Sequence, residues 1–173
     1  MGSYGTPSYR VGLIIADAQP FHNGHVKAIG DALMYCDEVI ISFYGYDTAY
    51  FDYNINQKLS RNIFGTSPRI AHFGVETPER EIIIPKLKIE YTLDKLDEAN
   101  YNMPTHFFTN YDDWVEPAKE LQLETIRIST LANTKSNEIY QSILNGTDLW
   151  KEKVPYANID MIETYIATKN RNF

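Results

Sequence analysis

The feature that most constrains the fold lies within the first 36 residues: an apolar run, a short turn and an amphipathic segment follow one another. Residues 10–16 have the sequence R-V-G-L-I-I-A, which is typical of a strand buried on both faces of a parallel sheet. After the turn, Val26, Ile29 and Leu33 recur at helical spacing. This order predicts a buried strand followed by an α-helix.

The turn between these two segments carries two histidines. If the helix begins near Phe21, the spacing of His22 and His25 places both rings on one side of its first turn. The N-terminus of a helix offers unpaired N–H groups and the positive end of the dipole, which suit a phosphate. Gly24 leaves space for an anion to approach the backbone. These residues therefore predict a phosphate-binding site.

Two other interpretations of the histidines stay open. His22 and His25 could share one metal ion, but a third ligand would be needed. The other histidines are His72 and His106, and Cys36 lies in or just after the first helix. The pair could also be ordinary polar residues at a helix start. We expect a phosphate site and no metal ligands from the protein.

Strand-like and helix-like segments alternate along the rest of the chain. Strands are predicted at residues 37–43, 81–84, 105–109 and 125–129, and helices at residues 56–64, 87–99, 136–145 and 158–168. This alternation predicts an α/β fold with a doubly wound parallel sheet of about five strands. A chain of 173 residues with 43% hydrophobic residues is large enough for one globular domain with a real core, and we expect residues 1–173 to form one.

Several local features qualify this pattern. Residues 65–78 are rich in Gly, Pro, Thr and Ser, so an insertion or loop is expected at about 65–85. Residues 1–8 are expected to be disordered or vector-derived. Leu87, Tyr91, Leu93 and Leu96 are expected near one side of their helix, and Asp112 could cap the helix that follows it.

Ligands bind at the carboxyl ends of the strands in such a sheet. This rule brings together residues 16–25, 44–47, 109–114 and 129–136. The last segment is rich in hydroxyl groups and contains Lys135, so a second helix start could hold a triphosphate while the lysine neutralises charge. Plain helix capping by Thr134 or Ser136 is the alternative.

Charge and cysteine content limit the partners. The net charge is −7 and the isoelectric point is about 5.1, which argues against a broad nucleic-acid surface. No run approaches the roughly 20 apolar residues of a membrane span, and the N-terminus lacks the apolar segment of a signal peptide. One cysteine allows no internal disulfide. We therefore expect a cytoplasmic protein that binds neither nucleic acid nor membrane.

Residues 19–25, with the sequence Q-P-F-H-N-G-H, resemble the Q-P-F-H-x-G-H form of archaeal and bacterial nicotinamide mononucleotide (NMN) adenylyltransferases, which belong to the HxGH nucleotidyltransferase superfamily. Residues 128–139 resemble the I-S-x-T-x-I-R element of that family more loosely. Residues 143–146, 149–150 and 154–155 resemble its end of helix, tryptophan and V-P pair. The resemblance covers nearly the whole chain, but only the first motif is close to diagnostic.

The resemblance implies a Rossmann-like nucleotidyltransferase fold and the transfer of AMP from ATP to NMN, which gives NAD and pyrophosphate. It implies Mg²⁺ as cofactor, and we expect a homo-oligomer. The catalytic residues implied are His22, His25 and Lys135. The residues expected to bind the nucleotide are Ala16, Asp17, Gly24, Thr109, Asn110, Asp112, Ser129, Thr130, Thr134 and Ser136. The residues expected to contact the acceptor are Tyr91, Tyr46 and Trp114.

Three departures from the family pattern stand out. Asp17 occupies the position of an arginine just after the first strand. Tyr140 replaces the arginine expected after Ile139, and Lys135 or Arg127 could substitute for it. Residues 65–85 have no clear counterpart in the compact archaeal enzymes.

The resemblance leaves other activities open. Residues 112–114 resemble the D-D-W of glycerol-phosphate cytidylyltransferases, and residues 128–130 with 134–135 resemble their I-S-T-T-K. Against this, residues 16–19 are A-D-A-Q where that group has G-T-F-D. A nucleotide-binding module without turnover is a third possibility, given Asp17 and Tyr140. The sequence does not distinguish NMN from nicotinic acid mononucleotide as acceptor.

Overall fold

The protein is built on one sheet of five parallel strands. The computed structural model describes residues 8–45, 49–76, 84–129 and 134–171. The strands are β1 (Val11–Ala16), β2 (Glu38–Gly45), β3 (Ile70–Glu76), β4 (His106–Thr109) and β5 (Glu124–Arg127). Their order across the sheet is β3-β2-β1-β4-β5. The predicted doubly wound parallel sheet is confirmed.

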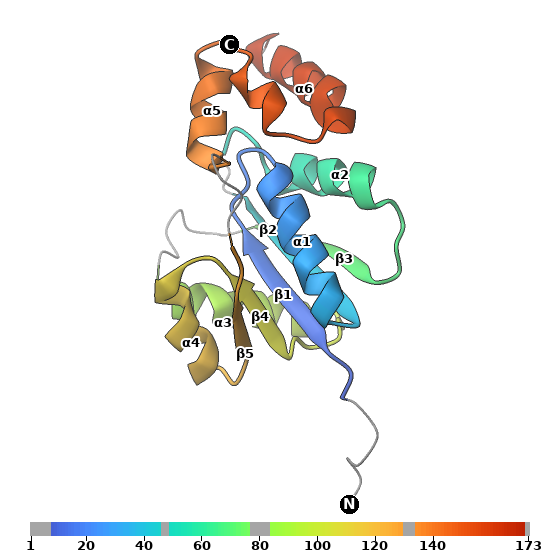
Figure 1. Ribbon diagram of the computed structural model, residues 1–173, viewed down its shortest axis with the longest axis vertical. Coiled ribbons are helices and arrows are strands. Elements are labelled where there is room, and N and C mark those ends of the chain that lie inside the picture. Colours follow the sequence, from blue (N-terminus) through green and yellow to red (C-terminus); the bar gives the residue numbers. More distant parts are fainter. Residues whose placement is uncertain (1–7, 46–48, 77–83, 130–133, 172–173) are drawn as a thin grey trace, which may run out of the picture.

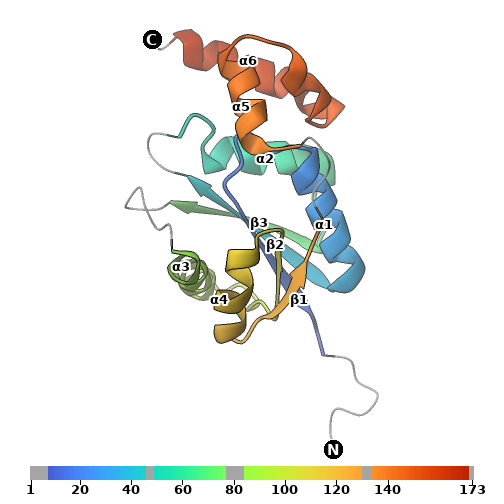
Figure 2. The same cartoon turned by 60° about the vertical axis from the view of Figure 1, so that its left-hand side comes forward.

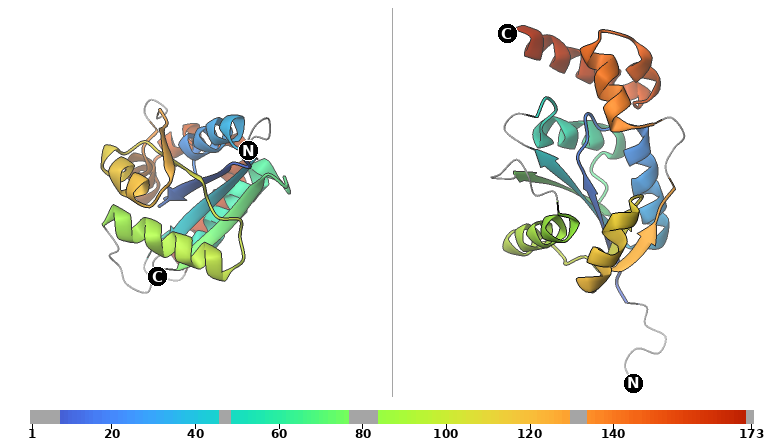
Figure 3. Two further views of the ribbon diagram at one scale, coloured as in Figure 1. Left: turned by 90° about the horizontal axis from the view of Figure 1, so that it is seen from below. Right: turned by 90° about the vertical axis from the view of Figure 1, so that its left-hand side faces the viewer.

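Helices cover both faces of the sheet. One face is covered by α1 (Asn23–Tyr35) and α2 (Tyr53–Phe64), the other by α3 (Pro85–Glu98) and α4 (Val115–Glu120) (Figures 2 and 3). Beyond the carboxyl ends of the strands lie α5 (Ser136–Leu144) and α6 (Ile159–Arg171) (Figure 1). Single helical turns occur at η1 (Asp112–Trp114), η2 (Leu149–Glu152) and η3 (Tyr156–Asn158). In the described part of the chain, no helix has both the length and the apolar character needed to cross a membrane.

The core consists of two apolar clusters, one on each face of the sheet. The larger lies under α1 and α2 and continues to α5 and α6 through Ile139, Trp150 and Ile162. The smaller lies under α3 and α4 and includes Leu13 and Phe107. The C-terminal helices are therefore packed on the same core as the first βα unit.

The third strand is the main error of the sequence prediction. It lies at Ile70–Glu76, inside the expected insertion at 65–85, whereas residues 81–83 of the predicted strand are outside the described residues. Its apolar pattern is interrupted by Gly74, which is favoured because a Cβ there would lie within 2.4 Å of Tyr53 and Gln57 of α2. Close helix packing thus accounts for the unusual composition of this strand.

Two helix starts also differ from prediction. The α2 helix begins at Tyr53, earlier than residue 56, because the side chain of Asp52 accepts a hydrogen bond from the backbone N–H of Ile55 (3.0 Å). Asp112 caps no helix, since η1 starts there without a side-chain cap and the Asp112 carboxylate pairs with Arg127.

The inward face of α3 differs from the predicted one as well. Leu96 is buried as predicted and Leu93 packs partly buried against the core, but Leu87 is half exposed, and Lys88, Ile89 and Thr92 are buried. The Tyr44 hydroxyl donates to the backbone carbonyl of Lys88 (2.9 Å) and contacts the Thr92 hydroxyl, which fixes this rotation of the helix against β2.

Candidate functional site

The carboxyl ends of β1 and β4 form the switch point of the sheet. The chain continues from β1 towards β2 on one side and from β4 towards β5 on the other. Connections that leave adjacent strands in opposite directions open a crevice, where ligands of doubly wound proteins bind. Residues 17–22 follow β1 directly and therefore lie at this switch point.

Two polar side chains hold the connection between β1 and α1. Gln19 forms a reciprocal pair with the backbone of Phe51, donating to its carbonyl (2.8 Å) and accepting from its N–H (3.2 Å). The buried side chain of Asn56 accepts from the N–H of Phe21 (2.9 Å) and donates to the carbonyl of Ala18 (2.9 Å). These contacts tie the connection to α2 and fix where α1 begins.

His22 and His25 lie together at the start of α1. His22 is the N-cap residue, and its Nδ1 accepts a hydrogen bond from the N–H of Gly24 (2.9 Å). Nδ1 of His25 accepts from the N–H of His22 (3.1 Å). The two ring centroids are 3.9 Å apart, and the His25 ring also stacks on buried Phe21. The predicted side-by-side arrangement of the histidines is confirmed.

These contacts determine the chemistry of the two rings. Because each Nδ1 accepts from a backbone N–H, the remaining proton of each neutral ring is on Nε2. Burial lowers the pKa of His22 to about 4. Burial, and then the neighbouring His22, lower the pKa of His25 well below its usual value. Both rings are therefore neutral at pH 7, with one N–H donor each, and such a donor can hydrogen-bond an oxyanion without carrying positive charge.

The start of α5 lies against this pair. Nε2 of His22 is 2.9 Å from Oγ of Ser136, so the two segments singled out in the sequence meet in space. The space beside Gly24 is filled by the His22 ring, since a Cβ on Gly24 would lie 2.7 Å from its Cε1 and 3.6 Å from Cγ2 of Thr134. The expectation that Gly24 leaves room for an anion is thus corrected, because this glycine makes room for His22.

Lys135 is exposed at the N-cap of α5, and no side-chain capping bond forms there. Ser136 directs its hydroxyl to His22 instead of capping the helix. The first-turn N–H groups of α5 therefore lie next to the histidine pair without a side-chain cap, as an anion site requires.

Other expected nucleotide-binding residues lie at the ends of β4 and β5. Buried Thr109 ends β4 and accepts from the N–H of Tyr111 (3.1 Å). Arg127, at the end of β5, pairs with Asp112. Ser129 accepts from Nζ of Lys27 (3.2 Å), which links this segment to α1. Ala16 is buried at the end of β1 and Asn110 is half-buried just after β4, while Thr130 lies outside the described residues.

A lysine that the sequence analysis missed lies on the α3 side of the same edge. The side chain of Lys88 is only 6% exposed, and its Nζ is 2.5 Å from Oδ2 of Asp17. The ammonium also lies 4.5 Å from the ring centroid of Tyr44 and 5.8 Å from that of Trp114. A lysine next to leucines in an amphipathic helix is expected on the exposed face, so the sequence does not indicate that Lys88 is buried. Its burial becomes visible only once the rotation of α3 against the sheet is known.

The remaining expected residues are spread out. Tyr91 donates to the backbone carbonyl of Glu76 (3.0 Å) at the end of β3, while Trp114 stacks on Phe107 at the end of β4. Tyr46 lies outside the described residues. Tyr140 packs against Tyr50, with ring centroids 6.0 Å apart, so it belongs to an aromatic cluster.

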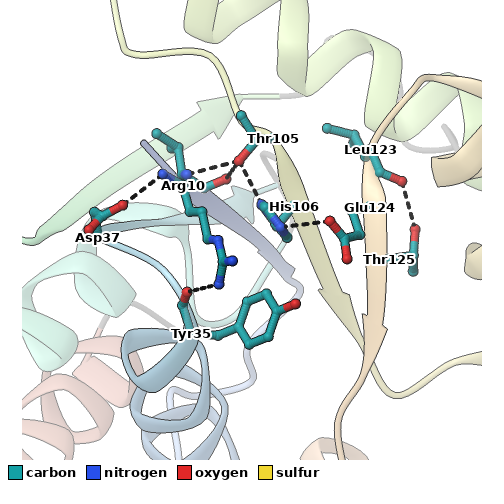
Figure 4. Close-up of polar contacts among 9 residues, drawn as sticks. Arg10, Tyr35, Asp37, Thr105, His106, Leu123, Glu124 and Thr125 are labelled. Atoms are coloured by element: carbon teal, nitrogen blue, oxygen red, sulfur yellow. Dashed lines mark hydrogen bonds and ion pairs between the residues drawn. The ribbon is translucent and has the colours of Figure 1, made fainter. Parts of the chain in front are cut away.

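The other two histidines lie elsewhere. His72 is buried in β3, and His106 joins a polar network with Thr105 and Glu124 at the amino end of the sheet (Figure 4). Within the described ranges, no three His, Cys, Asp or Glu side chains are grouped so that they could hold a metal ion. Asp17 and Asp112 at this edge are each paired with a cation.

Solved structures with the same fold were found by comparison. A bifunctional NMN adenylyltransferase/ADP ribose pyrophosphatase from Francisella tularensis, crystallised with AMP and a manganese ion, matches with a TM-score of 0.66 and 16% identity. The match covers 95% of this chain and 54% of the other. A NadR protein in complex with NAD and AMP-PNP matches with a TM-score of 0.60 and 15% identity, over 87% of this chain and 46% of the other.

These matches show the fold. The protein has the Rossmann-like α/β fold of the nucleotidyltransferases among its structural neighbours, as predicted. It spans about half the length of these neighbours. No family model and no curated protein matches the sequence.

Proposed function

We propose that the protein is a nucleotidyltransferase that transfers AMP from ATP to NMN and forms NAD and pyrophosphate. The observation that carries the proposal is the pair of neutral histidines at the start of α1, joined by the His22–Ser136 contact to the start of α5. The backbone N–H groups of Asn23 and Gly24 at the start of α1 are already engaged within the protein, so the Nε2–H groups of the histidines and the uncapped first turn of α5 are the donors that would hold a polyphosphate.

In this reaction an oxygen of the NMN phosphate attacks the α-phosphorus of ATP. A new P–O bond forms while the bond to the β-phosphate oxygen breaks, and pyrophosphate leaves. His22 and His25 donate to the phosphate oxygens as negative charge shifts towards the leaving group. Lys135, exposed at the start of α5, neutralises the β and γ phosphates. Positioning and charge stabilisation suffice, so no covalent enzyme intermediate is required.

Mg²⁺ enters this proposal with the nucleotide, as MgATP, because two carboxylates at this edge, Asp17 and Asp112, are already paired with cations. The Francisella neighbour was crystallised with AMP and manganese, which supports a nucleotide–metal substrate. We place adenine over the ends of β4 and β5, near Thr109 and Asp112, where backbone groups can contact its edge. Trp114, Tyr91 or an aromatic residue of the range 44–53 would contact nicotinamide.

A pyrophosphate-release screen tests this function. ATP or CTP is combined with NMN, nicotinic acid mononucleotide, glycerol phosphate or pantetheine phosphate in the presence of Mg²⁺. We expect the fastest release with ATP and NMN, together with NAD formation. Pyrophosphate release only with CTP and glycerol phosphate would contradict ATP and NMN as substrates, but the protein would still be a nucleotidyltransferase. Nucleotide binding without release in every combination would identify a binding module.

A further inference from the structure

Lys88 is a buried cation that the proposed reaction has not yet used. Lysine is almost never fully buried unless it is paired, and this side chain is 6% exposed. An ammonium carries three N–H donors. Within the described residues, the hydrogen-bond acceptor recorded for Nζ of Lys88 is Asp17. A single carboxylate oxygen cannot accept from all three donors, so the ammonium can form further hydrogen bonds. It lies in an enclosed place, beside the rings of Tyr44 and Trp114.

The ion pair is asymmetric. Asp17 has a side chain that is 50% exposed, whereas that of Lys88 is nearly sealed. Solvent and ligands can therefore reach the pair from the Asp17 side. Asp17 directly follows β1 and stands five positions before His22, so this opening lies on the connection that also carries the histidines.

We propose that Lys88 is the binding residue for the phosphate of the acceptor, and that Asp17 is an internal anion that this phosphate displaces. The inference rests on the function proposed above. A phosphomonoester dianion carries more charge than a carboxylate and offers three terminal oxygens, so it can occupy the N–H donors that Asp17 leaves. The displaced carboxylate becomes solvated at little cost, because it is already half exposed.

This arrangement separates the two phosphate-bearing substrates. The histidines lie at the start of α1 and the lysine comes from α3, and these helices cover opposite faces of the sheet (Figure 3). The nucleotide phosphates bind on the α1 side and the acceptor phosphate on the α3 side, so the two anions meet over the carboxyl end of β1. Lys88 then selects phosphorylated acceptors, because an unphosphorylated nucleoside leaves the Lys88–Asp17 pair in place.

A purely structural ion pair makes a different prediction. If Asp17 and Lys88 only stabilise the fold, removing either one harms the protein in the same direction. If Asp17 is displaced by the ligand, its removal helps the acceptor phosphate and removal of Lys88 abolishes the phosphate preference. The two halves of one ion pair thus give opposite effects on binding.

The test is equilibrium binding by calorimetry without nucleotide, so that turnover plays no part. The probes are NMN, nicotinamide riboside and inorganic phosphate, measured on wild type, Lys88→Met and Lys86→Met. Lys86 lies on the same helix but is exposed and pairs with Glu120 at 3.2 Å, which makes it the matched control. We expect wild type and Lys86→Met to bind NMN at least about tenfold more tightly than the riboside. Lys88→Met should bind both with equal affinity.

Asp17→Asn is the second variant of the test, and it keeps the proposal testable if Lys88→Met does not fold. It should bind NMN as tightly as wild type or a few-fold more tightly. The inference is overturned if Lys88→Met keeps the phosphate preference, if Asp17→Asn loses NMN binding, or if neither NMN nor phosphate binds wild type. If wild type binds inorganic phosphate through Lys88 but not NMN, the anion site stands and the acceptor proposed above is wrong.

Discussion

The two ends of the sheet both carry histidine, and they use it in opposite ways. At the amino end, Nδ1 of His106 lies 2.6 Å from Oγ1 of Thr105, and Nε2 lies 3.0 Å from Oε2 of Glu124 (Figure 4). Both ring nitrogens are thereby engaged, one by Thr105 just before β4 and the other by Glu124 of β5. At the carboxyl end, Nδ1 of His22 and Nδ1 of His25 each accept a hydrogen bond from the backbone. Nε2 of His22 contacts the Ser136 hydroxyl, and Nε2 of His25 has no hydrogen-bond partner among the described residues.

This difference separates a structural network from the proposed binding site. Thr105 also accepts from the N–H of Val11 (3.0 Å), and Asp37 accepts from that of Arg10 (2.8 Å), so the amino-end contacts fix where the chain enters β1 (Figure 4). A closed network of this kind has nothing left to offer a ligand. At the carboxyl end the backbone holds both rings in place, the Nε2–H of His22 contacts the Ser136 hydroxyl, and the Nε2–H of His25 has no acceptor in the part of the chain that the structure describes.

The largest expected effect comes from removing a carboxyl-end histidine. His22→Ala and His25→Ala should each lower kcat by roughly 10²-fold or more, since each removes a preorganised donor to the transition state. His106→Ala is the control: we expect kcat within about twofold of wild type and an unfolding free energy lower by about 1–2 kcal/mol. Steady-state kinetics and urea unfolding of the three variants measure both effects. An equal loss of kcat in His106→Ala and in the His22 and His25 variants would contradict the distinction between a structural end and a binding end of the sheet.

A smaller effect is expected from the exposed lysine at α5. Lys135→Ala should raise the KM for ATP and lower kcat, reducing kcat/KM for ATP by about five- to tenfold, because one charge contact to the phosphates is lost. The KM for NMN should change little. Arg127→Ala should do less, since Arg127 is paired with Asp112. Unchanged ATP kinetics in Lys135→Ala would mean that another cation, with Lys58 and Arg61 next to test, takes the position of the family arginine.

The smallest effect concerns pH and stability. Burial lowers the pKa of His72 to about 4, so the unfolded chain binds more protons than the folded protein between that value and about 6.5. The contribution of this histidine to the free energy of unfolding should therefore be fully present above about pH 6.5 and decrease as the pH falls. The expected decrease from pH 7 to pH 6 is about 0.7 kcal/mol for each such histidine. His72→Leu should reduce this slope by one such contribution in unfolding experiments at the two pH values. An unchanged slope would show that His72 takes up protons in the folded protein as it does in the unfolded chain, so that burial does not lower its pKa.

Local patterns were sufficient for most of the fold and for the centre of the candidate site. The run at 10–16, the helical spacing after Val26 and the pair His22 and His25 are short-range signals, and the structure confirms them. The meeting of His22 with Ser136 follows from the rule that the carboxyl ends of parallel strands share one edge.

What could not be predicted depends on contacts between distant segments. Ile70–Glu76 becomes a strand because it pairs with β2 and packs under Tyr53. Lys88 is buried because Tyr44, 44 positions earlier, sets the rotation of α3. Neither effect leaves a periodic signal in the sequence itself. Tyr140, which stands where the family pattern has an arginine, packs on Tyr50, a contact that the sequence does not show either.

The most direct test of the account is a nuclear magnetic resonance titration of the histidine ring nitrogens. Protein labelled with ¹⁵N-histidine is titrated at pH 7 with Mg²⁺ and an ATP analogue whose α,β-bridging oxygen is replaced by methylene. We predict that His22 and His25 are neutral with the proton on Nε2 before addition, that their Nε2 signals shift on binding, and that His106 does not respond. Charged rings in the free protein, or a response at His106 with none at His22 and His25, would contradict the account.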